Sequence, residues 1–111
     1  MRVAIANIPK WGFAILESRI ESKTTEYAES LGMMHLKLNV KGRVGWPDHI
    51  YVWNGRTWFV EFKQYKVKPE PVQLYIHSEL RKRGAVVRSI DNLIDGRMMI
   101  NELFNLPPVC S

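Results

Sequence analysis

Residues 47–63 read PDHIYVWNGRTWFVEFK, and this stretch predicts the centre of the fold. Two segments rich in β-branched and aromatic residues, 47–53 and 56–63, flank the pair Asn54-Gly55. That pair favours the two-residue turn of a β-hairpin, because both central positions of the turn need a positive φ. Such a turn sets Trp53 opposite Arg56, and the same register sets Asp48 opposite Glu61. We therefore expect two carboxylates side by side at the end of a hairpin.

The opposed carboxylates predict a cation site. Directly opposed residues have Cβ atoms about 4.5–5.5 Å apart, and two ionised carboxylates so close repel unless a cation lies between them. Because side chains alternate along a strand, Lys63 shares the face of Glu61, whereas Phe62 points to the other face. Carboxylates hold Mg²⁺, and a nearby lysine can orient a water or stabilise charge on a phosphate. Asp48, Glu61 and Lys63 thus suit metal-assisted hydrolysis of a phosphodiester; the ordinary alternative is a turn aspartate followed by a solvated strand face.

The segments around the hairpin predict an α/β (α+β) domain with a small mixed β-sheet flanked by helices. Apolar periodicity and breaker residues predict helices at 14–31, 71–83 and 92–104, and further strands at 33–40 and 85–90. The first helix would present Leu16, Ile20, Lys23, Tyr27 and Leu31 on one face, and Asp91 would cap the last helix. Residues 3–5 could add a short strand.

Composition sets the class of protein. The chain has 111 residues, enough for one domain, and 16 basic against 11 acidic residues leave a net charge of +5, which suggests a polyanionic partner. A single cysteine, Cys110, allows no internal disulfide, and no apolar run is long enough to span a membrane. The three histidines lack zinc spacing, and strand alternation turns His49 away from Asp48, as a packed or surface residue. We expect a soluble intracellular domain.

At these residues the chain resembles the PD-(D/E)xK nuclease superfamily, and more closely its VRR-NUC (virus-type replication-repair nuclease) family, especially the short stand-alone members of phages. The resemblance extends over about residues 17–90. It rests on Glu17-Ser18-Arg19-Ile20-Glu21, Gly45-Trp46-Pro47-Asp48, Phe59-Val60-Glu61-Phe62-Lys63 and Pro71-Val72-Gln73-Leu74. Trp46 departs from the family, in which smaller aliphatic residues are common before the proline. This tryptophan could stack on a base or fill the edge of the hairpin.

The resemblance implies one nuclease domain over residues 1–111 with a restriction-endonuclease-like core and Mg²⁺ or Mn²⁺ as cofactor. It makes Asp48, Glu61 and the backbone carbonyl of Phe62 metal ligands, and Lys63 the catalytic lysine. Glu21 would be a further acid at the metal, with Glu17 as second choice; for both, a solvated helix face is the alternative. Gln73 would orient Lys63 or the phosphate, unless it is simply a residue near a helix N-terminus.

DNA is the expected partner. Backbone contacts are expected from the basic residues that flank the site, Lys37, Lys41, Arg43, Lys66 and Lys68. A second basic group, Arg81, Lys82, Arg83 and Arg88, includes a helix C-terminus and is explained as well by the helix dipole. The resemblance implies a homodimeric endonuclease for branched, Holliday-junction-like DNA, in the host cytoplasm if a phage encodes it. The alternatives are a non-catalytic DNA-binding module with the same fold and, less well supported in so short a chain, a sequence-specific restriction enzyme.

Overall fold

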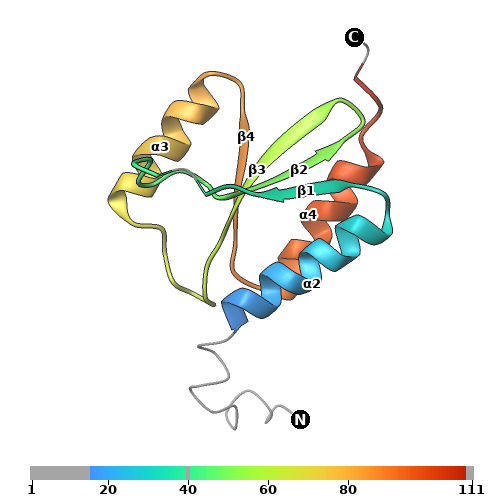
Figure 1. The fold of residues 1–111 in the computed structure, drawn as a ribbon, viewed down its shortest axis with the longest axis horizontal. Coiled ribbons are helices and arrows are strands. Elements are labelled where there is room, and N and C mark those ends of the chain that lie inside the picture. Colours follow the sequence, from blue (N-terminus) through green and yellow to red (C-terminus); the bar gives the residue numbers. More distant parts are fainter. Residues whose placement is uncertain (1–15, 40, 110–111) are drawn as a thin grey trace, which may run out of the picture.

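The structure is a computed structural model that describes residues 16–39 and 41–109. The strand suggested at residues 3–5 and the cysteine Cys110 lie outside these residues. The described elements follow one another along the chain in the order expected (Figure 1). They are α2 (Leu16–Ser30), β1 (Met34–Lys37), β2 (His49–Trp53), β3 (Arg56–Phe62), α3 (Pro71–Lys82), β4 (Val86–Ile90) and α4 (Leu93–Asn105).

The strands form one mixed sheet in the order β1-β2-β3-β4. β1 pairs with β2 and β2 with β3 in antiparallel fashion, whereas β4 joins β3 in parallel after the α3 crossover. The mixed α+β architecture expected from the sequence is therefore confirmed. The first strand is shorter than predicted, because its pairing with β2 ends at Lys37, opposite His49.

The hairpin between β2 and β3 has the predicted turn and register. Asn54 and Gly55 both have positive φ, at 49° and 81°, as a two-residue turn requires. Trp53 pairs with Arg56, and the ladder continues to His49 opposite Val60. The next position of the same register sets Asp48 opposite Glu61. From the far end of the chain, the Val109 backbone N–H donates to the Asn54 carbonyl at 3.1 Å and fastens the turn.

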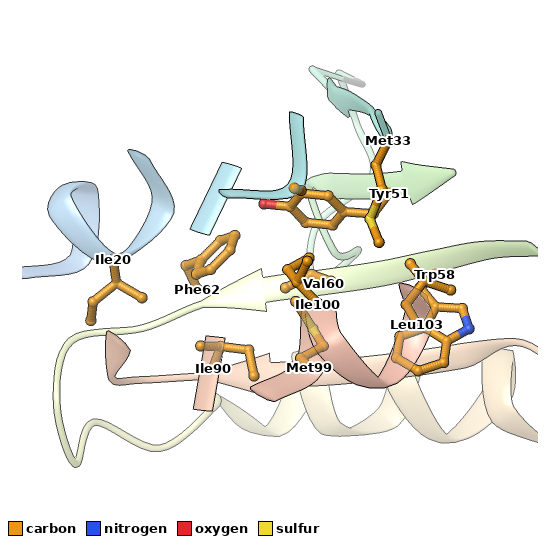
Figure 2. Packing of buried hydrophobic residues seen from close by; sticks show 11 residues of the cluster. Ile20, Met33, Tyr51, Trp58, Val60, Phe62, Ile90, Met99, Ile100 and Leu103 are labelled. Carbon is orange, nitrogen blue, oxygen red and sulfur yellow. The ribbon is translucent and has the colours of Figure 1, made fainter. Parts of the chain in front are cut away.

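The helices lie on opposite faces of the sheet (Figure 1). Helices α2 and α4 pack against each other and cover one face, while α3 packs against β4 on the other. The core forms between the sheet and the α2–α4 pair, and Figure 2 shows its largest members converging there. The buried residues of this core are Ile20, Ala28, Met33, Tyr51, Trp58, Val60, Phe62, Ile90, Met99, Ile100 and Leu103.

Two details of the helices differ from the sequence prediction. The buried positions of α2 are Ile20, Thr24 and Ala28, whereas Lys23 is exposed, because the helix turns its small residues toward α4. The last helix is capped by Asn92, whose Oδ1 accepts a hydrogen bond from the Asp95 backbone N–H at 2.8 Å. Asp91 instead accepts hydrogen bonds from the Asn92 amide and from the Lys66 backbone N–H.

Of the helices in residues 16–39 and 41–109, none combines the length and the apolar character needed to cross a bilayer.

Candidate active site

The end of β3 carries an acid and a lysine on the same face of the sheet. Val60 and Phe62 point into the core, so the intervening Glu61 faces the α3 side. The Lys63 backbone N–H donates to the Ile90 carbonyl at 2.9 Å, which extends the pairing with β4 by one residue. The alternation therefore continues through Lys63, and its side chain shares the face of Glu61.

Glu61 is buried, and only one of its two carboxyl oxygens has a hydrogen-bond partner among the described residues. The residue is 8% exposed. Its Oε2 accepts a hydrogen bond from Gln73 Nε2 at 3.4 Å, whereas its buried Oε1 has no hydrogen-bond partner among the described residues. Burial, with the nearby Asp48 carboxylate as second cause, raises the pKa of Glu61 to about 7, although the Lys63 ammonium opposes this shift. A buried acceptor without a donor is costly, and a cation would satisfy it.

Asp48 lies one residue before the first paired residue of β2. Its backbone carbonyl accepts a hydrogen bond from the Leu38 N–H at 2.6 Å, so the backbone at Asp48 is held although the residue is outside the ladder. The side chain is 44% exposed and reaches solvent. Asp48 thus joins the buried Glu61 to an open surface, as a site for a hydrated ion requires.

His49 is packed, as expected, but it does not point away from Asp48. It is 1% exposed, and its Nε2 lies 3.5 Å from both Asp48 Oδ1 and Glu21 Oε1. Its Nδ1 is 2.7 Å from His35 Nε2. A carboxylate prefers an N–H, so His49 presents its Nε2 hydrogen to the acids and accepts a hydrogen from His35. Strand alternation misplaced this ring because Asp48 precedes the ladder.

The two candidate acids of α2 have different surroundings. Glu21 Oε1 accepts a hydrogen bond from Lys37 Nζ at 3.2 Å and lies beside His49. Glu17 is exposed, yet its charge contributes to the raised pKa of Glu61, so it faces the same region. Within the described part of the chain, no group of three or more His, Cys, Asp or Glu side chains is close enough to hold a metal ion together. The structure thus places Glu21 at the edge of the site, held by Lys37 and His49.

Gln73 connects the first turn of α3 to the site. Its Oε1 accepts a hydrogen bond from the Glu70 backbone N–H at 2.9 Å, and its Nε2 donates to Glu61. The glutamine therefore lies beside the site, as the sequence predicts. In this structure it orients the Glu61 carboxylate, whereas the sequence interpretation had it acting on Lys63 or on a phosphate.

The basic residues divide into two groups by their ion pairs. Lys41 and Arg43 lie in the loop before Asp48, and Lys63, Lys66 and Lys68 line a cavity of about 470 Å³ beyond β3. In contrast, five other cations face carboxylates within 4 Å: Lys23 with Glu26, Lys37 with Glu21, Lys82 and Arg83 with Glu79, and Arg88 with Glu102. Lys37 therefore differs from the other four expected DNA contacts, because Glu21 already neutralises it.

Among the comparisons with known proteins, the one with solved structures matches the fold. No protein-family model matches the chain, and no curated protein matches it. A solved structure described as a VRR_NUC domain superposes with a TM-score of 0.72 at 37% sequence identity, covering 77% of this chain and 94% of that one. The mixed four-stranded sheet flanked by helices is therefore a nuclease-like fold. The chain belongs to the VRR-NUC family.

Proposed function

We propose that the protein is a DNA endonuclease that hydrolyses phosphodiester bonds with Mg²⁺ or Mn²⁺. The observation that carries the proposal is the buried Oε1 of Glu61, which has no hydrogen-bond partner among the described residues, with Asp48 and Lys63 near enough to shift the pKa of Glu61. A buried carboxyl oxygen without a partner costs free energy that a bound ligand would offset. Two carboxylates and a backbone carbonyl are the oxygen donors that a hard divalent cation prefers.

Each residue of the site has a separate role in the proposed reaction. Asp48, Glu61 and the Phe62 carbonyl would hold the ion, which supplies an activated water and neutralises charge on the phosphate. Gln73 donates to Oε2 of Glu61 at 3.4 Å and so helps to hold this carboxylate, while Oε1 would be left for the ion. The Lys63 ammonium orients the attacking water or stabilises the negative charge that develops on the phosphate oxygens. Glu21 would approach through water, since it is bound to Lys37.

The basic loops on both sides of the site support DNA as the substrate. Lys41 and Arg43 precede Asp48, and Lys66 and Lys68 follow Lys63 in the chain, so a phosphate backbone that crosses the site meets positive charge at entry and exit. A preference for branched DNA rests on the family resemblance, and cutting both strands of a junction requires two such sites.

A homodimer would supply the second site. The described chain exposes apolar side chains on several surfaces, among them the uncovered sheet face at Met34 and Leu36 and the outer face of α4 at Ile94 and Met98. Light scattering during gel filtration should give the mass of a dimer. Met34→Glu with Leu36→Glu, and separately Ile94→Glu with Met98→Glu, would show which surface mediates the association. A wild-type monomer at micromolar concentration would refute it.

Cleavage assays test the endonuclease. The wild-type protein should cut linear, flap or four-way-junction DNA in Mg²⁺ or Mn²⁺ and stop in EDTA. Asp48→Asn, Glu61→Gln and Lys63→Ala should each reduce the cleavage rate at least about 100-fold while DNA binding persists, because they remove ligands or transition-state charge. Glu26→Gln, the same charge change on an exposed helix face, is the control and should cut normally.

One observation favours the alternative, a DNA-binding module without activity: no three acidic or histidine side chains of the described residues are arranged so that they could hold a metal ion. Strong DNA binding without cleavage in any metal would establish that alternative. Normal cutting by the Asp48, Glu61 and Lys63 variants would show that the site is elsewhere.

A further inference from the structure

A cavity of about 490 Å³ opens beside Asp48, on the α3 side of the sheet, and no role assigned above uses it. Its size is within the range of small-molecule sites. One part of the cavity wall is apolar and the other part is polar. The apolar lining includes Leu38, Trp46 and Phe59, and the polar lining includes Asn39, Arg43 and Asp48.

Trp46 is held in this wall by the backbone on either side of it. Gly45 has a φ of +87°, and a Cβ at this position would lie 2.9 Å from the Val72 carbonyl oxygen, so the loop presses against the start of α3. Pro47 on the other side is fully buried. The indole nevertheless remains 39% exposed. The ring therefore lies between two packed backbone segments and stays partly open to solvent at the cavity.

The polar part of the lining carries the groups that recognise nucleobases. The Arg43 guanidinium lies 5.8 Å from the centre of the Trp46 ring, and Asn39 is exposed at the same cavity. Guanidinium and amide groups form two hydrogen bonds at once with the edge of a base. Unpaired bases stack on aromatic rings. A base in a duplex is covered on both faces, so only an unpaired base offers a free face to Trp46.

We infer that this cavity binds an unpaired nucleobase of the DNA, stacked on Trp46, next to the phosphate that is cut. The inference rests on the proposed nuclease function, because Asp48 belongs to both the cavity and the metal site. It specifies the substrate class as DNA with at least one unpaired nucleotide at the cleavage point, such as a flap or an open junction. It also assigns a role to the tryptophan that departs from the family pattern.

A binding cycle in EDTA tests the inference without any cleavage. Flap DNAs carry either a normal base or an abasic analogue at each unpaired position in turn, and each is titrated against wild type and Trp46→Ala. At one position, removal of the base should weaken wild-type binding roughly 5- to 150-fold, the range found for stacked bases. Trp46→Ala should weaken binding of the normal DNA by a similar factor, and the abasic change should then have no further effect. Trp46→Phe should restore most of the affinity.

Tyr75→Ala is the matched control, since Tyr75 is an aromatic residue with 62% exposure that does not line this cavity. It should keep the full difference between normal and abasic DNA. A second readout uses 2-aminopurine at the sensitive position, whose fluorescence should be quenched by wild type and Trp46→Phe but not by Trp46→Ala. Should Trp46→Ala not fold, the wild-type abasic series and the phenylalanine variant still decide the question.

The outcomes separate this inference from the proposed activity. The base cavity would be overturned if wild type bound normal and abasic DNA with equal affinity at every position. It would also be overturned if the loss of affinity caused by Trp46→Ala and the loss caused by the abasic position multiplied when the two were combined. Either result would hold even if the protein cuts DNA. Coupling between Trp46 and one base, in a protein that cuts in no metal, would establish the cavity and refute the endonuclease. Failure to bind any of these DNAs would overturn both.

Discussion

At the scale of single residues, the ionisation of Glu61 makes a prediction that needs no DNA. Its folded pKa of about 7 exceeds the ordinary value of 4.5, so folding favours the protonated form. This contribution is complete below pH 4.5 and is lost as the pH rises through 7, because the unfolded chain then ionises freely while the folded chain must bury a charge. In the absence of metal, the wild-type protein should therefore lose stability over this window.

Glu61→Gln removes the titration while keeping the shape of the side chain. At pH 8 in EDTA we expect the variant to be more stable than wild type, by at most about 3 kcal/mol from the pKa difference. At pH 4.5 and below the gain should disappear. Urea denaturation at both pH values measures the free energy of unfolding, with the exposed Glu26→Gln as control. A variant destabilised equally at both pH values would contradict the cause assigned to the shift.

Sequence reasoning succeeded at residues whose positions follow from local backbone rules. Glu61, Phe62 and Lys63 alternate as predicted, because alternation is a property of the strand backbone and Lys63 still pairs with β4. The same rule failed at His49, since its neighbour Asp48 lies outside the ladder. The ring's contact with His35 follows from the β1–β2 register. The segment between these strands carries Gly42, Gly45 and Pro47 rather than one two-residue turn, so no single turn type predicts that register.

At the scale of elements, the crossing of α2 and α4 depends on a glycine. Gly96 is buried in α4, and a Cβ at this position would lie 2.3 Å from Thr24 Oγ1 and 3.4 Å from Thr24 Cβ. From the sequence alone, Gly96 weakens this helix, since glycine costs about 1 kcal/mol relative to alanine in a helix interior. The structure shows what offsets this cost, namely the close approach of the two helices.

Gly96→Ala should therefore destabilise the protein despite the better helix propensity of alanine. We expect a net loss of about 1–3 kcal/mol, typical of overpacking. In the double variant, Thr24→Ala should restore most of the lost stability, because the Thr24 hydroxyl is the group that the new Cβ would contact most closely. That hydroxyl is buried without a hydrogen-bond partner among the described residues, so its removal breaks no bond. Thermal unfolding of both single variants and the double variant gives the coupling, and strictly additive effects would exclude this contact as the cause.

The elements themselves were predictable to different degrees. The turn at Asn54-Gly55 follows from two adjacent residues that tolerate positive φ, and the hairpin register follows from the turn. The limits of β1 depend instead on where β2 stops pairing, which is a tertiary matter that residues 33–40 do not encode. Helix α2 was found by its period, and Ile20, Tyr27 and Leu31 of the predicted face do pack in or against the core. The buried Thr24 and Ala28 were not predicted, because only the position of α4 decides which flank is covered.

At the scale of the whole molecule, the site is assembled from segments that no local rule connects. The hairpin brings Asp48 to one position beyond its last pair, His49 and Val60, whereas Gln73 of α3 and Glu21 of α2 reach the site from opposite faces of the sheet. Their proximity was predicted only through the family resemblance. Their roles remain predictions, and so do those of the metal ligands and of Lys63.

The net charge of +5 is also a property of the whole molecule, but the structure shows that its parts are not equivalent. Lys82 and Arg83 lie 3.0 Å and 3.1 Å from Glu79, which largely cancels their local field. Lys66 and Lys68 line the cavity that contains Lys63, with no carboxylate within 4 Å of either ammonium among the described residues. A polyanion should therefore bind along Lys66 and Lys68 rather than along Lys82 and Arg83.

The salt dependence of DNA binding distinguishes these two pairs. Each phosphate contact contributes about 0.9 to the slope of log K against log salt concentration, because it releases a condensed counterion. Lys66→Ala with Lys68→Ala should reduce the slope by roughly 1.8 and weaken all sequences alike. Lys82→Ala with Arg83→Ala removes the same formal charge and should leave the slope unchanged. Equal reductions in the two double variants would show that DNA responds to the total charge of the domain and not to a defined path across the site.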